Sequence, residues 1–204
     1  MKKIVALLLA LVCAFALVSC GGPENPPDEG TDYTNLNPFK TAITASAPAT
    51  AVITVELENT ISDEPLTGTF SVTYGAESTQ VEYEYEQFVE INANAPTESD
   101  RETVTGTATI DKNGNVTGGD INATVTAATL LNYNLDGTKM TYTVEAGVLS
   151  ATIAAANTES VLGVNIGADV TFTLTVANGK IVSVTLNYQA ATGAAEITTT
   201  YTYA

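Results

Sequence analysis

The chain has 204 residues, a net charge of −16 at pH 7, and no histidine or tryptophan. The missing histidine excludes Ser-His-Asp and Cys-His catalysis and histidine metal ligands. The acidic balance disfavours nucleic acid, which proteins bind through basic contacts to phosphate, and it disfavours adsorption to anionic lipid head groups. The length that follows an export signal suits one domain.

Residues 1–19 have the organisation of an export signal. A basic start is followed by an apolar run over 4–18, which is the usual length of a signal core and short for a membrane span. The run ends in the letters LVSC at 17–20, which resemble the lipobox of bacterial lipoproteins. The resemblance implies cleavage before Cys20, a diacylglycerol on its sulfur, and a fatty acyl chain such as palmitate on its new amino terminus. The alternative is an ordinary signal peptide with an unrelated cysteine.

Residues 20–34 are rich in Gly, Pro and acidic side chains, and they predict a flexible tether between the lipidated cysteine and a β-rich domain over 35–204. Because Cys13 and Cys20 are the only cysteines, this domain has no thiol, disulfide or cysteine metal ligand. The predicted location is the extracytoplasmic face of the cell membrane, held by the lipid anchor. Gly21 after the cysteine resembles clostridial-type signals, and an outer-membrane lipoprotein is the alternative.

Helix is scarce along the chain. The segment NLNPFKTAITAS at 35–46 predicts a helix, with Asn37 as its cap, Pro38 at its first position, and an apolar stripe that includes Phe39 and Ile43. A helical turn is predicted at 157–163.

Apolar residues alternate with Thr, Ser or Glu along most of the rest of the domain, which predicts strands with one apolar and one polar face. Gly118-Gly119 predicts a bulge before a further strand with Ile121 and Val125, and Gly147 predicts another bulge. The alternating segments are 66–74, 81–91, 103–110, 140–145, 170–176, 182–188 and 197–203.

Matching apolar faces across each turn predicts the register of three hairpins. A three-residue loop at 177–179 would set Leu174 opposite Val182 and Phe172 opposite Val184. A two-residue loop at 192–193 would set Tyr188 opposite Ile197. A three-residue loop around Asn113-Gly114 would set Ile110 opposite Val116.

The predicted fold class is mainly β: one strongly curled antiparallel meander of about nine or ten strands, half-barrel-like, with a short N-terminal helix. The order of an N-terminal helix and a long meander in a lipoprotein is similar to the Lol-type and mycobacterial lipoprotein carriers. That resemblance implies a curled sheet whose interior holds acyl chains. It rests on architecture, so it transfers no site residues.

The stretch VEYEYEQFVEI at 81–91 places Glu82, Glu84 and Glu86 on one face, about 6.6–6.8 Å apart. This spacing is compatible with a glycosidase-like carboxylate pair, with calcium, or with the solvent face of a strand. We favour the solvent face, because pairing with 102–110 would set the glutamates opposite threonines. The segment DKNGN at 111–115 is interpreted as a hairpin turn rather than a calcium loop.

The sequence therefore predicts a non-catalytic, lipid-anchored binding protein, with no enzyme activity, cofactor or metal. Its partners would be the membrane, through the anchor, and an apolar or amphipathic ligand held in the curled sheet, but no nucleic acid. The alternative is a cell-surface structural or protein-interaction module with a self-filled core. The lipidation residue is Cys20, and the predicted ligand-lining residues are Phe70, Tyr83, Tyr85, Phe172, Leu174, Val184, Leu186 and Tyr201.

Overall fold

The computed structural model describes residues 33–204 apart from 46, 60–63, 89–100, 120, 132 and 192. The predicted signal, the lipidated Cys20 and nearly all of the predicted tether lie outside the described residues. No helix among the described residues is long and apolar enough to cross a bilayer.

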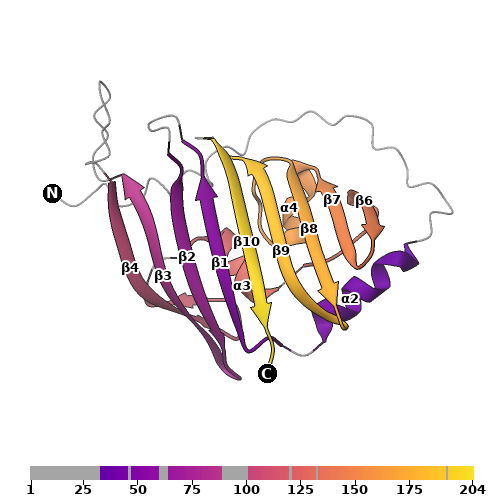
Figure 1. Cartoon of the computed structure of the whole chain (residues 1–204), viewed down its shortest axis with the longest axis horizontal. Coiled ribbons are helices and arrows are strands. Elements are labelled where there is room, and N and C mark those ends of the chain that lie inside the picture. Colours follow the sequence, from indigo (N-terminus) through magenta and orange to yellow (C-terminus); the bar gives the residue numbers. More distant parts are fainter. Residues whose placement is uncertain are drawn as a thin grey trace.

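Ten antiparallel strands form one sheet, in the order β5-β4-β3-β2-β1-β10-β9-β8-β7-β6 (Figure 1). The mainly β, antiparallel prediction is confirmed. Two five-stranded meanders are joined where the first strand pairs with the last, and the edge strands do not pair with each other, so the sheet is not closed into a barrel. The strands are β1 (Thr50–Leu57), β2 (Leu66–Tyr74), β3 (Ser78–Phe88), β4 (Arg101–Asp111), β5 (Val116–Thr117), β6 (Met140–Glu145), β7 (Val148–Ile153), β8 (Val170–Ala177), β9 (Lys180–Gln189) and β10 (Ala194–Thr202).

The helices lie on one face of this sheet, called the inner face here (Figure 1). They are the 3-10 turn η1 (Thr34–Leu36), α2 (Asn37–Thr44), α3 (Ala123–Leu130), the 3-10 turn η3 (Ala155–Asn157) and α4 (Thr158–Leu162). The helix α2 contacts β8 and β9, and α3 contacts β1. Because β5 and β6 are at opposite edges, the connection that holds α3 must cross the inner face between them.

The apolar side chains of the strands point to the inner face and form one core with the helices. Phe172, Leu174 and Ile53 are fully buried there. Strands such as β2 contribute every second residue, because successive side chains of a strand point to opposite faces.

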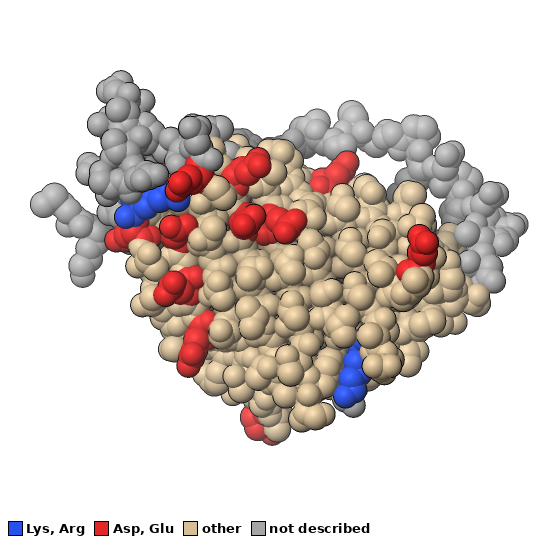
Figure 2. Space-filling view, viewed as in Figure 1, with Lys and Arg blue, Asp and Glu red and all other residues tan. Residues whose placement is uncertain are grey.

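The opposite, outer face is dominated by threonine, a good strand former whose hydroxyl remains hydrated. The pairing of β3 with β4 confirms the predicted register: Glu86, Glu84 and Glu82 lie opposite Thr103, Thr105 and Thr107. Figure 2 shows this face with few charged side chains, which lie mainly over its left and upper parts.

Two hairpin predictions are wrong. The loop between β8 and β9 has two residues, since Ala177 pairs with Lys180, and a bulge beside Val176 then sets Leu174 opposite Val184. The bulge restores the match of apolar faces that the short loop alone would break. Between β9 and β10, Gln189 pairs with Ala194, so that loop is longer than the predicted one.

Three further predictions concern the middle of the chain. Ile110 lies opposite Val116, as predicted. The predicted strand after Gly118-Gly119 is wrong, because 123–130 is the helix α3. Gly147 is not in a bulge: with Ala146 it forms the two-residue turn between β6 and β7, both residues having positive φ.

Both predicted helical segments are confirmed. In α2, Leu36 rather than Asn37 occupies the cap position, and the buried residues Phe39 and Ala42 face the core. The turn at 155–162 is η3 followed by α4. The central strand β1 is absent from the predicted segments, because its run Ala51–Val55 contains the outward-facing but apolar Val52.

Candidate functional site

Three aromatic rings meet on the inner face where β2 and β3 pair. Phe70 lies opposite Tyr83 on the neighbouring strand. The ring centroids of Phe70 and Tyr83 are 6.2 Å apart, those of Phe70 and Tyr85 are 6.4 Å apart, and those of Tyr83 and Tyr85 are 5.8 Å apart. These distances are typical of interacting aromatic pairs. The three residues are called the aromatic cluster below.

Two glycines give the rings of this cluster their room. Gly68 of β2 lies opposite Tyr85, and Gly106 of β4 lies opposite Tyr83. A Cβ added at Gly106 would overlap the phenol ring of Tyr83, so this ring lies across the bare backbone of β4. The Tyr83 ring therefore lies along the sheet instead of pointing away from it. The apolar surface that the three rings of the aromatic cluster form is called the shelf below.

An apolar cleft of about 50 Å³ adjoins the shelf. Its sheet side is formed by Val55, Leu66, Phe70 and Tyr85, among others, and its other side by Ile121 and Val125 at the start of α3. Drug-sized ligands occupy pockets of about 300–1,000 Å³. In the described conformation the cleft therefore accepts only a small apolar group.

The rim of this cleft is polar. The Glu86 carboxylate accepts hydrogen bonds from the backbone N–H of Thr67 at 2.9 Å and from its hydroxyl at 2.8 Å. The Arg101 guanidinium lies 3.9 Å from the same carboxylate oxygen and donates to the backbone carbonyls of Glu64 and Pro65. A ligand at this rim would meet fixed charges and hydrogen-bonding groups beside an apolar surface.

The glutamate row on β3 does not form a metal or catalytic site in the described part of the chain. Glu82 and Glu84 are exposed on the outer face, whereas Glu86 is held by Thr67 and Arg101. No group of three or more acidic residues among the described residues is placed to hold a metal ion.

The predicted ligand-lining residues all lie on the inner face but in two places. Phe70 and Tyr85 line the cleft, and Tyr83 stands beside them on the shelf. The other five are buried in the core below β8, β9 and β10: Phe172, Leu174, Val184, Leu186 and Tyr201.

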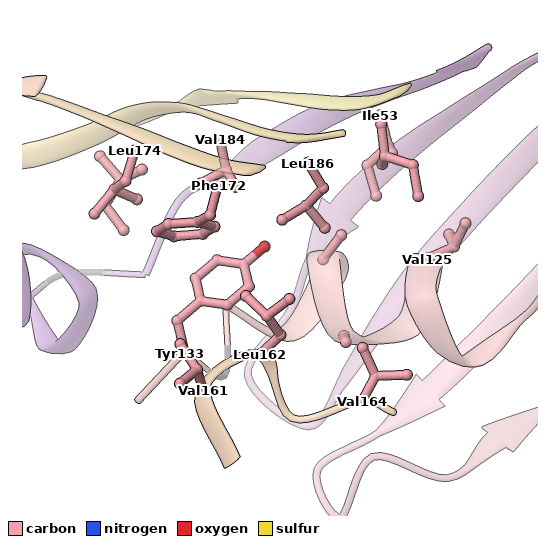
Figure 3. Close-up of a cluster of buried hydrophobic side chains, with 14 of the residues drawn as sticks. Ile53, Val125, Tyr133, Val161, Leu162, Val164, Phe172, Leu174, Val184 and Leu186 are labelled. Carbon is pink, nitrogen blue, oxygen red and sulfur yellow. The ribbon is translucent and has the colours of Figure 1, made fainter. Parts of the chain in front are cut away.

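That second region is filled by the protein's own side chains. The Tyr133 ring packs edge-on against Phe172, with 5.4 Å between centroids. Figure 3 shows Val161 and Leu162 beside Tyr133, all facing the side chains of the sheet, and both are fully buried. No pocket described for the inner face includes Phe172 or Leu174.

Two tyrosine hydroxyls tie α3 to the sheet. Tyr201 donates to the carbonyl of Ala128 at 3.1 Å, and Tyr74 donates to the carbonyl of Thr129 at 2.8 Å. Burial is the main cause that raises the pKa of both hydroxyls well above the ordinary value. Both therefore remain protonated donors, and they hold the C-terminal half of α3, away from the cleft.

At its other end α3 begins next to the cleft. The Asn122 side chain accepts a hydrogen bond from the backbone N–H of Val125 at 2.8 Å, which caps the helix. Asn122, Ile121 and Val125 all line the cleft. Sequence reasoning missed these residues because it placed them on a strand, although Asn122 before an Ala/Thr run is a cap signal.

A larger groove of about 720 Å³ lies where β1, β8, β9 and β10 end. Its lining is mostly polar and includes Glu56, Glu196, Asp169 and Asn187. Glu56 and Glu196 face each other directly across two strands, and like charges in that position destabilise a sheet. The groove would repel anionic ligands.

Comparisons with known proteins give no family. No family model matches the chain, and no curated protein matches it. A solved structure described as "GphF Dehydratase 1" aligns over 83% of each chain at 8% identity, with a TM-score of 0.18. Similarity at this level carries no argument about fold or activity.

Proposed function

We propose that this chain is a lipid-anchored, extracytoplasmic, non-catalytic binding protein that holds an apolar or amphipathic group at the aromatic cluster. The observation that supports this function is the unequal covering of the inner face. Tyr83, Tyr85 and Val104 are only half-buried at one end of the sheet, whereas Phe172 and Leu174 at the other end are fully buried.

The chemistry of the cluster suits an amphipathic ligand. Its rings offer apolar faces, and a ligand that covers them gains about 25 cal/mol per Å² of apolar surface removed from water. The carboxylate of Glu86 and the hydroxyl of Thr67, which are hydrogen-bonded to each other, lie in the lining of the same cleft. A ligand with an apolar body and a hydroxylated or amine-bearing end would use both.

A ligand larger than the cleft requires movement of the start of α3. Ile121 and Val125 bound the cleft, while the hydrogen bonds from Tyr74 and Tyr201 hold the other end of the helix. The first turn carries the Asn122 cap and the buried side chains of Thr124 and Val125, so a larger ligand must displace this turn from the core. We expect α3 to pivot at its C-terminal end when the cleft fills.

The anchor part of the proposal rests on the lipobox-like LVSC at 17–20 and on the charge of the domain. A net charge of −16 disfavours attraction of the protein surface to anionic lipid heads. Two or three acyl chains suffice for stable anchoring. We therefore expect Cys20→Ser to abolish both membrane retention and labelling of the protein by an alkyne fatty acid. Equal labelling of both chains would contradict the anchor.

Binding is tested with the Cys20→Ser chain expressed without residues 1–19, by native mass spectrometry and by displacement of an apolar dye with fatty acid. The matched variants are Tyr85→Ala, which removes part of the shelf, and Thr173→Ala, which changes the outer face only. We expect dye binding that fatty acid reverses, lost in Tyr85→Ala and kept in Thr173→Ala.

The second candidate function is a surface interaction module with a self-filled core. The filled region below β8, β9 and β10 favours it, because that half of the sheet leaves no described space for a ligand. If the dye does not bind and no small molecule co-purifies, the ligand-binding proposal is wrong and the interaction module is the better explanation.

A further inference from the structure

One long edge of the sheet is left largely without a neighbour in the described part of the chain. The eleven-residue strand β4 pairs with β3 along its whole length. On its other side the two-residue strand β5 pairs only with Thr109 and Ile110. Residues 102–108 thus have no ladder partner on their outward side among the described residues.

The hydrogen-bond pattern shows which backbone N–H and C=O groups of β4 point away from β3. The N–H of Asp111 donates to the carbonyl of Asn115 on the β5 side at 2.9 Å. In an antiparallel strand every second residue directs both its N–H and its C=O to the same side. Thr103 and Thr105 therefore direct theirs outward. At Thr107 the backbone of Gly119 closes in, since a Cβ at Gly119 would overlap the Thr107 carbonyl.

The two edges of the sheet differ in how other segments cover them. At the β6 edge the N-terminal segment is in place: the Tyr142 hydroxyl donates to the Asn35 side chain at 2.9 Å, and the Tyr33 ring lies 6.4 Å from that of Tyr142. Natural edge strands are usually protected by lysine, proline, a bulge or a covering segment. From 103 to 110, β4 has no charged residue, no proline and no register shift.

We propose that β4 pairs antiparallel with β4 of a second copy of this chain, about a two-fold axis at Val104. Thr103 of one copy then lies opposite Thr105 of the other, twice, and each such pair exchanges both backbone hydrogen bonds. Val104 faces Val104 on the inner side, and threonine faces threonine on the outer side. An antiparallel strand pairing is self-complementary, so one edge serves both copies.

Two copies with a net charge of −16 each repel one another, but residues 103–110 of β4 are uncharged, so the centre of the interface brings no like charges together. In this register Glu84 of one copy shares a row with Glu86 of the other, three strand spacings or roughly 14 Å away, so these like charges repel only weakly. Salt shortens the range of this repulsion, to about 8 Å at physiological ionic strength. The repulsion therefore acts mainly at low ionic strength, and the dimer should persist as the salt concentration rises.

The pairing does not depend on the proposed ligand, but it extends the surface on which that ligand would lie. Gly106 and Val104 adjoin Tyr83 and Tyr85 on the inner face. With two copies paired, both aromatic clusters lie on one continuous inner face, separated by the two β4 strands. The exposed flank of each shelf is then covered.

Cross-linking tests the register directly. Residues at a non-hydrogen-bonded antiparallel position have Cα atoms about 4.5 Å apart, which is within the range that a disulfide spans. We expect Val104→Cys to give a disulfide-linked dimer of the full chain under mild oxidation. The controls are the wild-type chain and Ser71→Cys, which is exposed on β2, a strand with both edges already paired. Cross-linking of Val104→Cys no greater than in these controls would overturn the proposal.

A second pair of variants tests the backbone bonds. Thr105→Pro removes an outward N–H, so the ladder with β3 is kept, whereas Thr105→Ala keeps that N–H. Sedimentation at increasing salt should show a dimer for the wild type and Thr105→Ala, and a monomer with unchanged circular dichroism for Thr105→Pro. A wild type that stays monomeric at every concentration and salt level would refute the pairing. If Thr105→Pro fails to fold, the cross-linking result decides.

Discussion

The inner face of the sheet is covered in two different ways. Below β8, β9 and β10, residues of α4 and the segment around Tyr133 fill the space against Phe172 and Leu174. Near β2, β3 and β4 the covering is thinner: Phe70 of the aromatic cluster is buried, but Tyr83 and Tyr85 are half-buried beside an apolar cleft. The same alternating sequence pattern produces both regions. The difference between core and candidate site therefore comes from which connections cross the sheet, and not from the strands.

The largest expected effect is a difference in the free energy of unfolding between a truncation in the filled region and a truncation in the aromatic cluster. Phe172→Ala removes a fully buried ring and should lower the free energy of unfolding by about 3–5 kcal/mol. Tyr85→Ala removes a half-buried ring and should cost no more than about 2 kcal/mol. Urea unfolding of both variants measures these values. Equal costs would mean that the two regions are packed alike.

The second test concerns the space that Gly106, which has no Cβ, leaves for the Tyr83 ring. Gly106→Ala places a Cβ in the space of the Tyr83 ring and should cost about 1–3 kcal/mol. In a Tyr83→Ala background the same change should cost almost nothing, because the clash is gone. Strictly additive costs in this double-mutant cycle would show that the ring does not lie over Gly106.

The link between the two regions is α3, and its tyrosine hydrogen bonds give a pH-dependent test. Tyr201→Phe should cost about 0.5–1.5 kcal/mol and increase amide exchange in α3. Burial raises the pKa of Tyr74 and Tyr201 in the folded state, so their contribution is full below about pH 10, where the unfolded tyrosine titrates. It is lost as the pH rises further. Stability should therefore fall above pH 10, and less steeply in Tyr74→Phe; an unchanged slope would exclude this role.

The smallest expected effect distinguishes two glutamates of one row. Glu84→Gln changes an exposed side chain and should alter stability by no more than about 0.5 kcal/mol. Glu86→Gln weakens the hydrogen bonds from Thr67 and the ion pair with Arg101, and should cost about 1 kcal/mol, since the group is partly solvated. Thermal unfolding with and without calcium checks both. A calcium-dependent rise in melting temperature that Glu84→Gln abolishes would instead indicate a metal site.

The sequence predicted the strands well where polar and apolar residues alternate without interruption. The register of β3 with β4 is correct because the glutamates and tyrosines of β3 allow only one orientation. The loop between β8 and β9 was predicted wrongly, because a bulge beside Val176 exchanges faces within the strand and leaves no signal in the alternation. The helix α3 was missed since its Ala/Thr-rich residues have no strong period of their own, and tertiary contacts and the Asn122 cap stabilise it.

The site was harder to predict than the fold. Alternation placed all eight predicted ligand-lining residues on the correct face of the sheet. It does not show which of them are covered by other segments of the chain. That depends on the crossing of the connection between β5 and β6 and on where α4 docks. The polar–apolar alternation of the strands predicts neither the path of this connection nor the position of α4. The division of the inner face into a filled and an open region is therefore known only from the structure.

The pairing of β1 with β10 has a consequence for the way the chain folds. Thr50 pairs with Thr202, so the centre of the sheet joins residues from nearly opposite ends of the domain, whereas all other strand pairs join neighbours in sequence. Each meander can form early from local hairpins, but the two cannot merge until the last strand has been delivered. A pairing between residues so far apart in the sequence forms slowly, because the loop-closure entropy must be lost first. If the chain is exported from its amino terminus, as we propose, it crosses the membrane with an incomplete sheet, and the final strand completes the domain only after translocation ends.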